Sequence, residues 1–285
     1  MEMGNSNAFH YEGEKAWCPG CGDFAILNAV EKALIHAGKK PEEVLTVSGI
    51  GQAAKLPHYL KSNGFNGLHG RALPPAFGAK AANHHLTVIV TSGDGDMYGE
   101  GGNHFIHAIR RNIEMTVIVH DNQVYGLTKG QASPTSDKGM KTKLQPEGVI
   151  LTPFNPLAVA IALDAPFVAR SFSKEIDFTA DLIEQAMRYG GFALIDVLQP
   201  CVSFNKVNTY QWYQQRAYRL GPEHDPTDRA KALAKAFEWD SGIPLGVIYK
   251  NPRPGYVATV IGDTEPLLKR KVNTEKINSL LARLY

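Results

Sequence analysis

Two polar segments follow directly on apolar runs and carry side chains that are able to bind a metal ion. Asp94 follows residues 88–92, and Asn122 follows residues 116–120. Buried strands that end in such turns present them at the carboxyl edge of a parallel sheet, where open α/β folds bind ligands. Mg²⁺ prefers oxygen ligands and leaves positions for phosphate oxygens. We therefore predict a magnesium diphosphate site with Asp94, Asn122 and the Val124 carbonyl as ligands, although either segment alone is also typical of an ordinary turn.

Three cysteines form a second set of residues with metal chemistry. Cys18 and Cys21 make a C-x-x-C pair, and Cys201 follows an apolar run much later in the chain. An odd number of cysteines in a long chain does not make a disulfide framework. The spacing favours thiolate ligation of a metal centre. Zinc bound by three cysteines and either His10 or His58 is one alternative, although neither histidine has zinc-finger spacing. Buried cysteines without a ligand role are another.

The segments that must position these residues alternate between two patterns. Short apolar runs rich in β-branched residues predict strands, and the longer segments between them have helical spacing. Strands buried on both faces and alternating with helices indicate an α/β fold with a doubly wound, mostly parallel sheet, which we place at residues 15–200. The strands are expected at residues 44–48, 87–92, 115–120, 167–170 and 192–197, with helices near residues 24–38 and 176–189.

The composition changes after Cys201. Aromatic residues and prolines crowd the remaining segment, which we expect to be an irregular C-terminal extension, residues 201–285, packing on the domain and on a partner subunit. Helices are expected within it at about residues 225–240 and 274–285. The stretch from residue 122 to residue 153 is the longest apparent loop of the α/β region. Long loops in compact domains are usually functional, so we expect it beside the site.

Composition excludes several classes of protein. The chain has 285 residues, 44% of them apolar, which is enough for a sizeable core. Its 30 basic and 28 acidic residues are scattered and leave a formal charge of +2, which argues against binding to nucleic acid or to a membrane surface. The apolar runs are short, and the N-terminus lacks the apolar core of a signal peptide. We expect a soluble, cytoplasmic protein that binds neither nucleic acid nor membrane.

Five motifs, taken together and in order, resemble the β subunit of the 2-oxoacid:ferredoxin oxidoreductases, which are thiamine diphosphate enzymes. The resemblance extends over about residues 15–215. The motifs are Trp17-Cys18-Pro19-Gly20-Cys21-Gly22, Ser48-Gly49-Ile50-Gly51, His69-Gly70-Arg71, Gly93-Asp94-Gly95-Asp96 and Tyr125-Gly126-Leu127-Thr128-Lys129-Gly130-Gln131.

The resemblance implies a role for each matched position. Asp94, Asn122 and the Val124 carbonyl would hold Mg²⁺. Lys55 and Lys129 match positions that face the 2-oxoacid, with solvated surface charges as the alternative. The residues implied around thiamine diphosphate are Gly95, Asp96, Gly126 and Leu127 at the diphosphate, and Ile50, Gly51, Gln52 and Ala53 in a turn beside the cofactor. His69 is a third catalytic candidate, with a structural role in its turn as the alternative.

The resemblance also implies that Cys18, Cys21 and Cys201 bind a four-iron four-sulfur cluster near the thiamine. Four thiolates are normal for such a cluster. Gln52 stands where the family has its fourth cysteine. Three outcomes therefore stay open: a cluster with a non-cysteine or solvent ligand, a three-iron cluster, or no cluster.

The implied reaction is the oxidative decarboxylation of a 2-oxoacid to CO₂ and an acyl-coenzyme A, with electrons passing through the cluster to ferredoxin. We favour 2-oxoglutarate because of Lys55 and Lys129. The chain has length for the diphosphate-binding half only, so an α subunit with the pyrimidine-binding domain is the expected partner. One alternative is a non-oxidative thiamine diphosphate decarboxylase or synthase subunit, which Gln52 favours. The other is a noncatalytic zinc-binding assembly subunit.

Overall fold

Eight strands form one sheet in the order β2-β1-β3-β4-β8-β7-β10-β9 in the computed structural model, which describes residues 7–262 and 264–283. A separate short hairpin joins β5 (Val124–Tyr125) to β6 (Gln131–Ala132). The strands of the large sheet are β1 (Val44–Ser48), β2 (Asn63–Asn66), β3 (Thr87–Gly93), β4 (Met115–Asp121), β7 (Phe167–Phe172), β8 (Phe192–Leu198), β9 (Ala217–Arg219) and β10 (Ile243–Lys250).

The pairs of neighbouring strands are parallel except for β7 and β10, which run antiparallel. β4, β7 and β8 are buried along their whole length, as mainly apolar runs predict for strands covered on both faces, although β7 and β8 also bury Arg170 and Asp196. All five predicted strands form, within two residues of the predicted ends. The expected α/β fold with a mostly parallel sheet is therefore confirmed.

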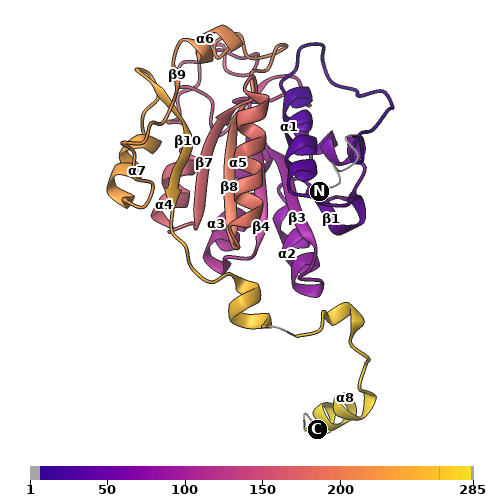
Figure 1. Cartoon of the computed structure of the whole chain (residues 1–285). Coiled ribbons are helices and arrows are strands. Elements are labelled where there is room, and N and C mark those ends of the chain that lie inside the picture. The colour runs from indigo at the N-terminus through magenta and orange to yellow at the C-terminus, as the bar shows by residue number, and fades with distance from the viewer. Residues whose placement is uncertain (1–6, 263, 284–285) are drawn as a thin grey trace.

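Helices cover both faces of the sheet and create two apolar cores (Figure 1). On one face α1 (Asp23–His36) and α5 (Ile176–Arg188) pack against each other and over the central strands. The opposite face carries α2 (Leu73–Ala82), α3 (Gly102–Arg111), α4 (Pro156–Ala162) and α7 (Arg229–Ala236). This arrangement leaves the carboxyl ends of β3 and β4 side by side at one edge of the sheet.

The segment after Cys201 is less irregular than expected. It contains α6 (Tyr210–Gln214), β9, α7 and β10, and its two strands extend the large sheet beyond β7. Pro244 and Gly246 interrupt the apolar pattern of β10, and a register shift follows at Val247, which explains why this strand was not predicted. The helix expected at residues 225–240 begins later, because the Asp228 side chain caps its start by accepting from the N–H groups of Ala230 and Lys231, and it ends at Ala236.

An arm that carries α8 (Thr274–Leu281) leads away from the sheet at the C-terminal end of the described chain (Figure 1). The helix begins where predicted, and residues 284–285 of the expected range lie outside the described residues. None of the helices in the described chain is both long and apolar enough to span a lipid bilayer.

Candidate active site

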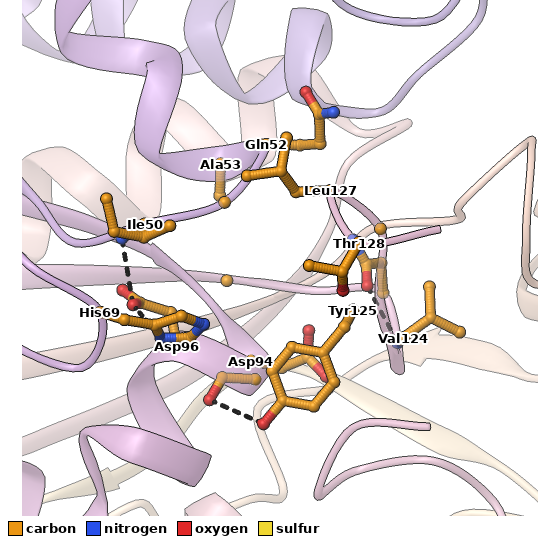
Figure 2. A pocket seen from close by; sticks show the side chains of 15 residues that line it. Ile50, Gln52, Ala53, His69, Asp94, Asp96, Val124, Tyr125, Leu127 and Thr128 are labelled. Atoms are coloured by element: carbon orange, nitrogen blue, oxygen red, sulfur yellow. Dashed lines mark hydrogen bonds and ion pairs between the residues drawn. The ribbon is translucent and has the colours of Figure 1, made fainter. Parts of the chain in front are cut away.

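β3 and β4 pair in parallel, with Gly93 opposite His120, so the polar residues behind each strand meet at the same edge. A pocket opens there (Figure 2). Every residue expected to bind Mg²⁺ or to surround the cofactor lines this pocket, and so does the catalytic candidate His69. The twelve residues are Ile50, Gly51, Gln52, Ala53, His69, Asp94, Gly95, Asp96, Asn122, Val124, Gly126 and Leu127. In Figure 2, Gln52, Ala53 and Leu127 lie along one side, and Asp94 and Tyr125 lie along the other.

Asp94 is buried at the base of this pocket, with 1% of its surface exposed. The Thr135 hydroxyl donates a hydrogen bond to its Oδ2 over 2.6 Å. Burial raises the pKa of the Asp94 carboxyl, while hydrogen bonds from Ser133, Thr135 and backbone N–H groups lower it. A divalent cation in the pocket would stabilise the ionised form that burial disfavours.

Two more buried carboxylates lie behind Asp94. The pKa of Asp121 is raised by burial and by the charges of Asp196 and Asp94. Burial also raises the pKa of Asp196 to about 6, against the lowering effects of Arg170 and of the Tyr98 hydroxyl. Arg170 Nε lies 3.8 Å from Asp196 Oδ2, which is an ion pair without a hydrogen bond. Burial and mutual repulsion therefore disfavour negative charge on these three carboxyls, and a bound Mg²⁺ would offset both effects.

Asn122 adds an amide oxygen to the same pocket. Its Oδ1 accepts a hydrogen bond from the Val124 N–H over 3.0 Å, and its Nδ2 donates to Gln199 Oε1 over 3.0 Å. The orientation of the amide is thus fixed from both ends. A carbonyl-type oxygen has a second lone pair, so Oδ1 can still bind a cation.

Asp96 organises the turns around the pocket. Its Oδ1 accepts hydrogen bonds from the backbone N–H groups of Ile50 over 3.1 Å and Gly70 over 2.7 Å, and its Oδ2 accepts from the Ser92 hydroxyl over 2.5 Å. This side chain was expected to adjoin the diphosphate. It does line the pocket, but its oxygens are occupied by donors from three segments of the chain, so its observed role is to hold those segments together.

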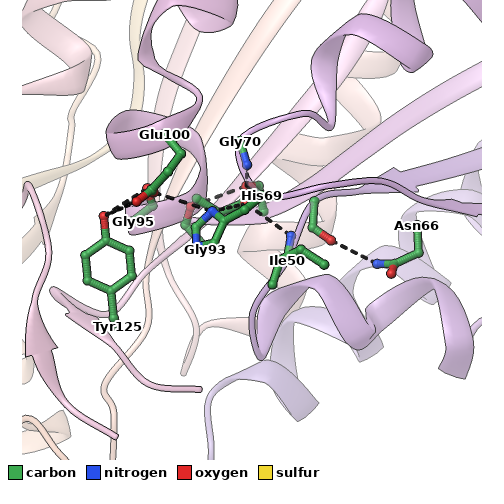
Figure 3. A network of polar contacts seen from close by, with 11 residues as sticks. Ile50, Asn66, His69, Gly70, Gly93, Gly95, Glu100 and Tyr125 are labelled. Carbon is green, nitrogen blue, oxygen red and sulfur yellow. Dashed lines mark hydrogen bonds and ion pairs between the residues drawn. The ribbon is translucent and has the colours of Figure 1, made fainter. Parts of the chain in front are cut away.

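His69 belongs to the same network, shown in Figure 3 between Ile50 on one side and Glu100 and Tyr125 on the other. Its Nδ1 lies 2.9 Å from Asp96 Oδ1 and 3.4 Å from Glu100 Oε2. The Tyr125 hydroxyl donates to the Glu100 carboxylate over 3.2 Å. Burial and the charge of Glu100 raise the pKa of Tyr125, so this phenol keeps its proton at neutral pH. Because Nδ1 faces carboxylates, Nε2 is the ring nitrogen left for a ligand.

The backbone geometry of the pocket also suits a phosphorylated ligand. Gly51 has a φ of +132°, which side-chain-bearing residues rarely adopt, and no other atom lies within 4 Å of the position a Cβ would take. Gly93, Gly95 and Gly126 line the same pocket. Gly93 and Gly126 leave backbone groups accessible to a ligand, whereas at Gly95 a Cβ would lie 2.3 Å from the Tyr125 ring, so that glycine makes room for Tyr125.

Comparison with known proteins is consistent with this geometry. Residues 46–197 match the family described as thiamine pyrophosphate enzyme, C-terminal TPP binding domain, and residues 201–261 match the C-terminal family of the pyruvate ferredoxin oxidoreductase beta subunit. The chain is 46% identical over 248 residues to a 2-oxoacid:ferredoxin oxidoreductase subunit beta from Sulfolobus sp., covering 82% of this chain and 81% of the relative. The chain belongs to the β subunits of the 2-oxoacid:ferredoxin oxidoreductases.

Other relatives have more specific names. This β subunit is 43% identical over 197 residues to the 2-oxoglutarate oxidoreductase subunit KorB of Mycobacterium tuberculosis, covering 69% of this chain and 53% of the relative. A solved structure, the 2-oxoglutarate:ferredoxin oxidoreductase from Magnetococcus marinus with 2-oxoglutarate, coenzyme A and succinyl-CoA bound, matches 98% of this chain and 97% of its own, with a TM-score of 0.91 and 35% identity. The expected enzyme family is confirmed.

The two lysines of the β subunit that were expected to face the substrate do not line the pocket. Lys55 Nζ donates to the Ala16 carbonyl over 3.0 Å. Lys129 is exposed and has a φ of +79° in the turn that follows Thr128, a residue that does line the pocket. Their predicted role in binding the 2-oxoacid stays a prediction.

The cysteine segments of the β subunit lie side by side. The Ser203 hydroxyl donates to Cys18 Sγ over 3.2 Å, Gln199 Nε2 donates to Cys21 Sγ over 3.3 Å, and the Phe204 N–H donates to Cys201 Sγ over 3.4 Å. Each sulfur thus has the kind of donor that iron–sulfur ligands accept.

No complete ligand set is formed in advance, however. Within residues 7–262 and 264–283, no group of three or more His, Cys, Asp or Glu side chains is placed to hold a metal ion. The zinc alternative gains no support, because neither His10 nor His58 belongs to such a group with the cysteines in the described residues. Burial and the charge of Asp23 raise the pKa of the Cys21 thiol, so binding of a metal there must displace a proton. The donor chemistry fits a cluster, and the cysteines must draw together to bind it.

Gln52 lies between these two sites. It lines the pocket, and its backbone carbonyl accepts a hydrogen bond from the Trp17 indole over 2.9 Å, next to Cys18. Its side-chain oxygen is buried and has no hydrogen-bond partner among the described residues. The position that lacks the fourth cysteine therefore offers a free oxygen.

Several residues of the site were not predicted. Tyr125 was part of a predicted motif but was given no role of its own, and no role was predicted for Thr135, Gln199 or Glu100. Thr135 and Gln199 lie in segments without a motif, and only the folded chain brings them to Asp94 and Asn122. The one available signal was the length of the loop from residue 122 to residue 153, which was expected beside the site and contributes Thr135.

Proposed function

We propose that this β subunit binds thiamine diphosphate and Mg²⁺ at the edge of β3 and β4, and takes part in the oxidative decarboxylation of 2-oxoglutarate. The single observation that carries the proposal is the convergence of Asp94, Asn122 and the glycine turns in one pocket. Asp94, Asn122 and the Val124 carbonyl would hold Mg²⁺. The proposal is further supported by the match to a thiamine pyrophosphate binding domain over residues 46–197.

The choice of 2-oxoglutarate rests on relatives. The subunit from Mycobacterium tuberculosis is named a 2-oxoglutarate oxidoreductase, and the solved relative holds 2-oxoglutarate, coenzyme A and succinyl-CoA. The lysines that suggested this acid from the sequence lie outside the pocket lining. We propose that Lys129, which is adjacent to pocket residue Thr128, and Lys55 supply positive charge to the substrate in the assembled enzyme.

The proposed reaction converts one 2-oxoglutarate and one coenzyme A thiol into succinyl-CoA and CO₂, and releases two electrons and one proton. The bond between the carboxylate and the 2-oxo carbon breaks, and a carbon–sulfur bond forms. Two one-electron transfers to ferredoxin balance the oxidation. Bound thiamine diphosphate supplies the carbon nucleophile and the electron sink that this cleavage needs.

The residues of this chain would orient and hold the reacting groups. Asp96 fixes the turns that carry Ile50 and Gly70, so the pocket wall keeps its shape as ligands enter and leave. His69 is held through Nδ1 by Asp96 and Glu100, which leaves Nε2 to exchange a hydrogen bond or a proton with a ligand. Its 40% exposed side chain is accessible to such a ligand.

We further propose that Cys18, Cys21 and Cys201 bind an iron–sulfur cluster that passes the electrons to ferredoxin, and that an α subunit supplies the pyrimidine-binding half of the thiamine site. The name "subunit beta" of the relatives supports a partner chain. The non-oxidative alternative is favoured by one observation, the oxygen of Gln52 at the position of the fourth cysteine. Without a cluster, the electrons would have no route out of the site.

Anaerobic co-purification with the α subunit tests the proposal. We expect thiamine, magnesium, iron and sulfide in the complex, and reduction of ferredoxin only when both 2-oxoglutarate and coenzyme A are present. Turnover of a 2-oxoacid by an iron-free complex would favour the non-oxidative alternative. Stoichiometric zinc without thiamine binding would favour an assembly subunit.

A further inference from the structure

Gln199 joins the two predicted sites of the β subunit. It follows β8, is 1% exposed, and its backbone N–H donates to the Asp121 carbonyl at the end of β4 over 2.8 Å. Its side-chain oxygen accepts from Asn122 Nδ2 over 3.0 Å, and its side-chain nitrogen donates to Cys21 Sγ over 3.3 Å. One side chain therefore contacts both a proposed magnesium ligand and a proposed cluster ligand.

The backbone determines the direction of each hydrogen bond in the series from Val124 through Asn122 and Gln199 to Cys21. The Val124 N–H can only donate, so the atom of Asn122 that it contacts must be Oδ1. Nδ2 of Asn122 then faces Gln199 and donates to Oε1. Nε2 of Gln199 is consequently the atom that faces Cys21 Sγ, and it also lies 3.3 Å from the Pro200 carbonyl.

The Gln199 side chain packs closely against the turn that contains Cys21 and Gly22. A Cβ added to Gly22, the residue after Cys21, would lie 2.8 Å from Gln199 Cγ and 2.9 Å from Ser173 Oγ. Real Cβ atoms do not approach other atoms so closely, so a glycine is required where the cysteine turn passes over Gln199. This close contact fixes the distance between the turn and the end of β8.

We propose that Gln199 is a positioning residue that couples the magnesium site to the cysteine site. This proposal rests on the proposed function. At one end, Gln199 orients the Asn122 amide so that Oδ1 faces the pocket. At the other end, its N–H stabilises negative charge on Cys21 Sγ, and hydrogen bonds to sulfur are among the factors that set the potential of iron–sulfur clusters. Added charge on the reduced cluster is stabilised by this donor, so the donor raises the reduction potential.

Two substitutions separate these effects. Gln199→Met keeps the length of the side chain but removes both the acceptor for Asn122 and the donor to Cys21. Gln199→Glu, studied at pH 8, keeps an acceptor for Asn122 but replaces the N–H donor by an oxygen. The exposed Gln214 in α6 provides the matched control, Gln214→Met.

The measurements use the αβ complex purified anaerobically. Calorimetry gives the Mg²⁺ affinity in the presence of thiamine diphosphate, and a potentiometric titration followed by electron paramagnetic resonance gives the midpoint potential. We expect Gln199→Met to weaken Mg²⁺ binding by about 10- to 100-fold, as is typical for loss of an outer-shell partner, and to lower the midpoint potential. Gln199→Glu should also lower the midpoint potential. Its Mg²⁺ affinity should stay within about 3-fold of the parent, a smaller change than the loss of an outer-shell partner causes.

The outcomes are distinct. A cluster-containing parent whose potential and Mg²⁺ affinity are unchanged in both variants would overturn the coupling and leave the proposed function intact. A parent complex without iron would overturn the proposed electron route and the coupling with it. If Gln199→Met does not fold, Gln199→Glu alone decides, because a purely structural role for Gln199 does not predict a lower potential together with a preserved Mg²⁺ affinity.

Discussion

The Thr135 hydroxyl lies 2.6 Å from Asp94 Oδ2, although 41 residues separate the two along the chain. The same hydroxyl lies 2.9 Å from Asp121 Oδ1, so it stands between two buried carboxylates. A hydroxyl has one proton to donate, and Asp94 is the nearer acceptor. Thr135 therefore supports the orientation of the proposed magnesium ligand from behind.

Thr135→Val should weaken Mg²⁺ binding by about 10- to 100-fold, because it removes an outer-shell hydrogen bond at nearly constant volume. Asp94→Asn should weaken it more, since it removes the charged ligand itself. Calorimetric titration with Mg²⁺ in the presence of thiamine diphosphate measures both. Thr227→Val, at an exposed position outside the site, is the control. Equal Mg²⁺ affinities for Thr135→Val and the parent would contradict the supporting role.

Asp96→Asn should loosen the turns around the pocket. The substitution replaces an acceptor oxygen by an NH₂ group among the donors of Ile50, Gly70 and Ser92. Hydrogen bonds to charged groups contribute about 1.5–3 kcal/mol each, so we expect the free energy of unfolding to fall by roughly 2–3 kcal/mol. Urea denaturation measures this, and thiamine diphosphate affinity should fall with it. A variant of unchanged stability would show that Asp96 is not the structural centre of these turns.

Asp196 should make the metal-free chain less stable as the pH rises. Burial raises its pKa to about 6 in the folded chain, above the ordinary value of 3.8. The folded chain thus holds this proton more tightly than the unfolded chain, so the contribution is fully present below about pH 4 and is lost as the pH rises through 6. A shift of this size corresponds to about 3 kcal/mol.

Asp196→Asn should therefore lose less stability than the parent between pH 4 and pH 7, by roughly that amount. Denaturation in urea at several pH values, with a chelator present, provides the comparison. The exposed Asp181→Asn serves as the control and should follow the parent. Parallel stability curves for parent and Asp196→Asn would rule out the assigned pKa.

Gln52→Cys should make a cluster at the cysteine site more resistant to oxygen. An amide oxygen is a much weaker iron ligand than a thiolate, so one iron of a four-iron cluster is poorly held beside Gln52. Electron paramagnetic resonance before and after brief exposure to air should show conversion to a three-iron form in the parent and less of it in the variant. Gln215→Cys adds an exposed thiol elsewhere and should behave as the parent. Equal conversion in all three proteins would place Gln52 outside the ligand shell.

The parts of the fold that could be predicted are those whose residues show their burial directly. β4 and β8 are buried along their whole length, and the sequence shows each as a mainly apolar run rich in β-branched residues or leucine. β2 could not be found in this way, because all of its residues, Asn63–Asn66, are exposed. It forms at the edge of the sheet through its backbone pairing with β1, and backbone pairing leaves no trace in side-chain pattern.

The site shows the same division. Residues of Gly93-Asp94-Gly95-Asp96 and of the Gln52 turn were identified from motifs and do line the pocket. The sequence did not predict that Asp96 accepts hydrogen bonds from backbone N–H groups. A carboxylate in a glycine turn has the same sequence pattern whether it faces a ligand or binds the backbone. Thr135 and Gln199 became visible only through contacts between distant segments, which no local pattern encodes.

The position of β10 in the sheet has a consequence for where the chain can be cut. β10 pairs with β7, a strand whose residues are all buried, and β9 lies outside β10. A fragment ending near residue 200, which would contain the whole thiamine pyrophosphate match, would leave the backbone N–H and C=O groups along one edge of β7 unpaired and its apolar side chains exposed. Exposed apolar edges of this kind recruit strands from other molecules and lead to aggregation. The change of composition at Cys201 thus marks a boundary between family matches, while the sheet itself continues to Lys250.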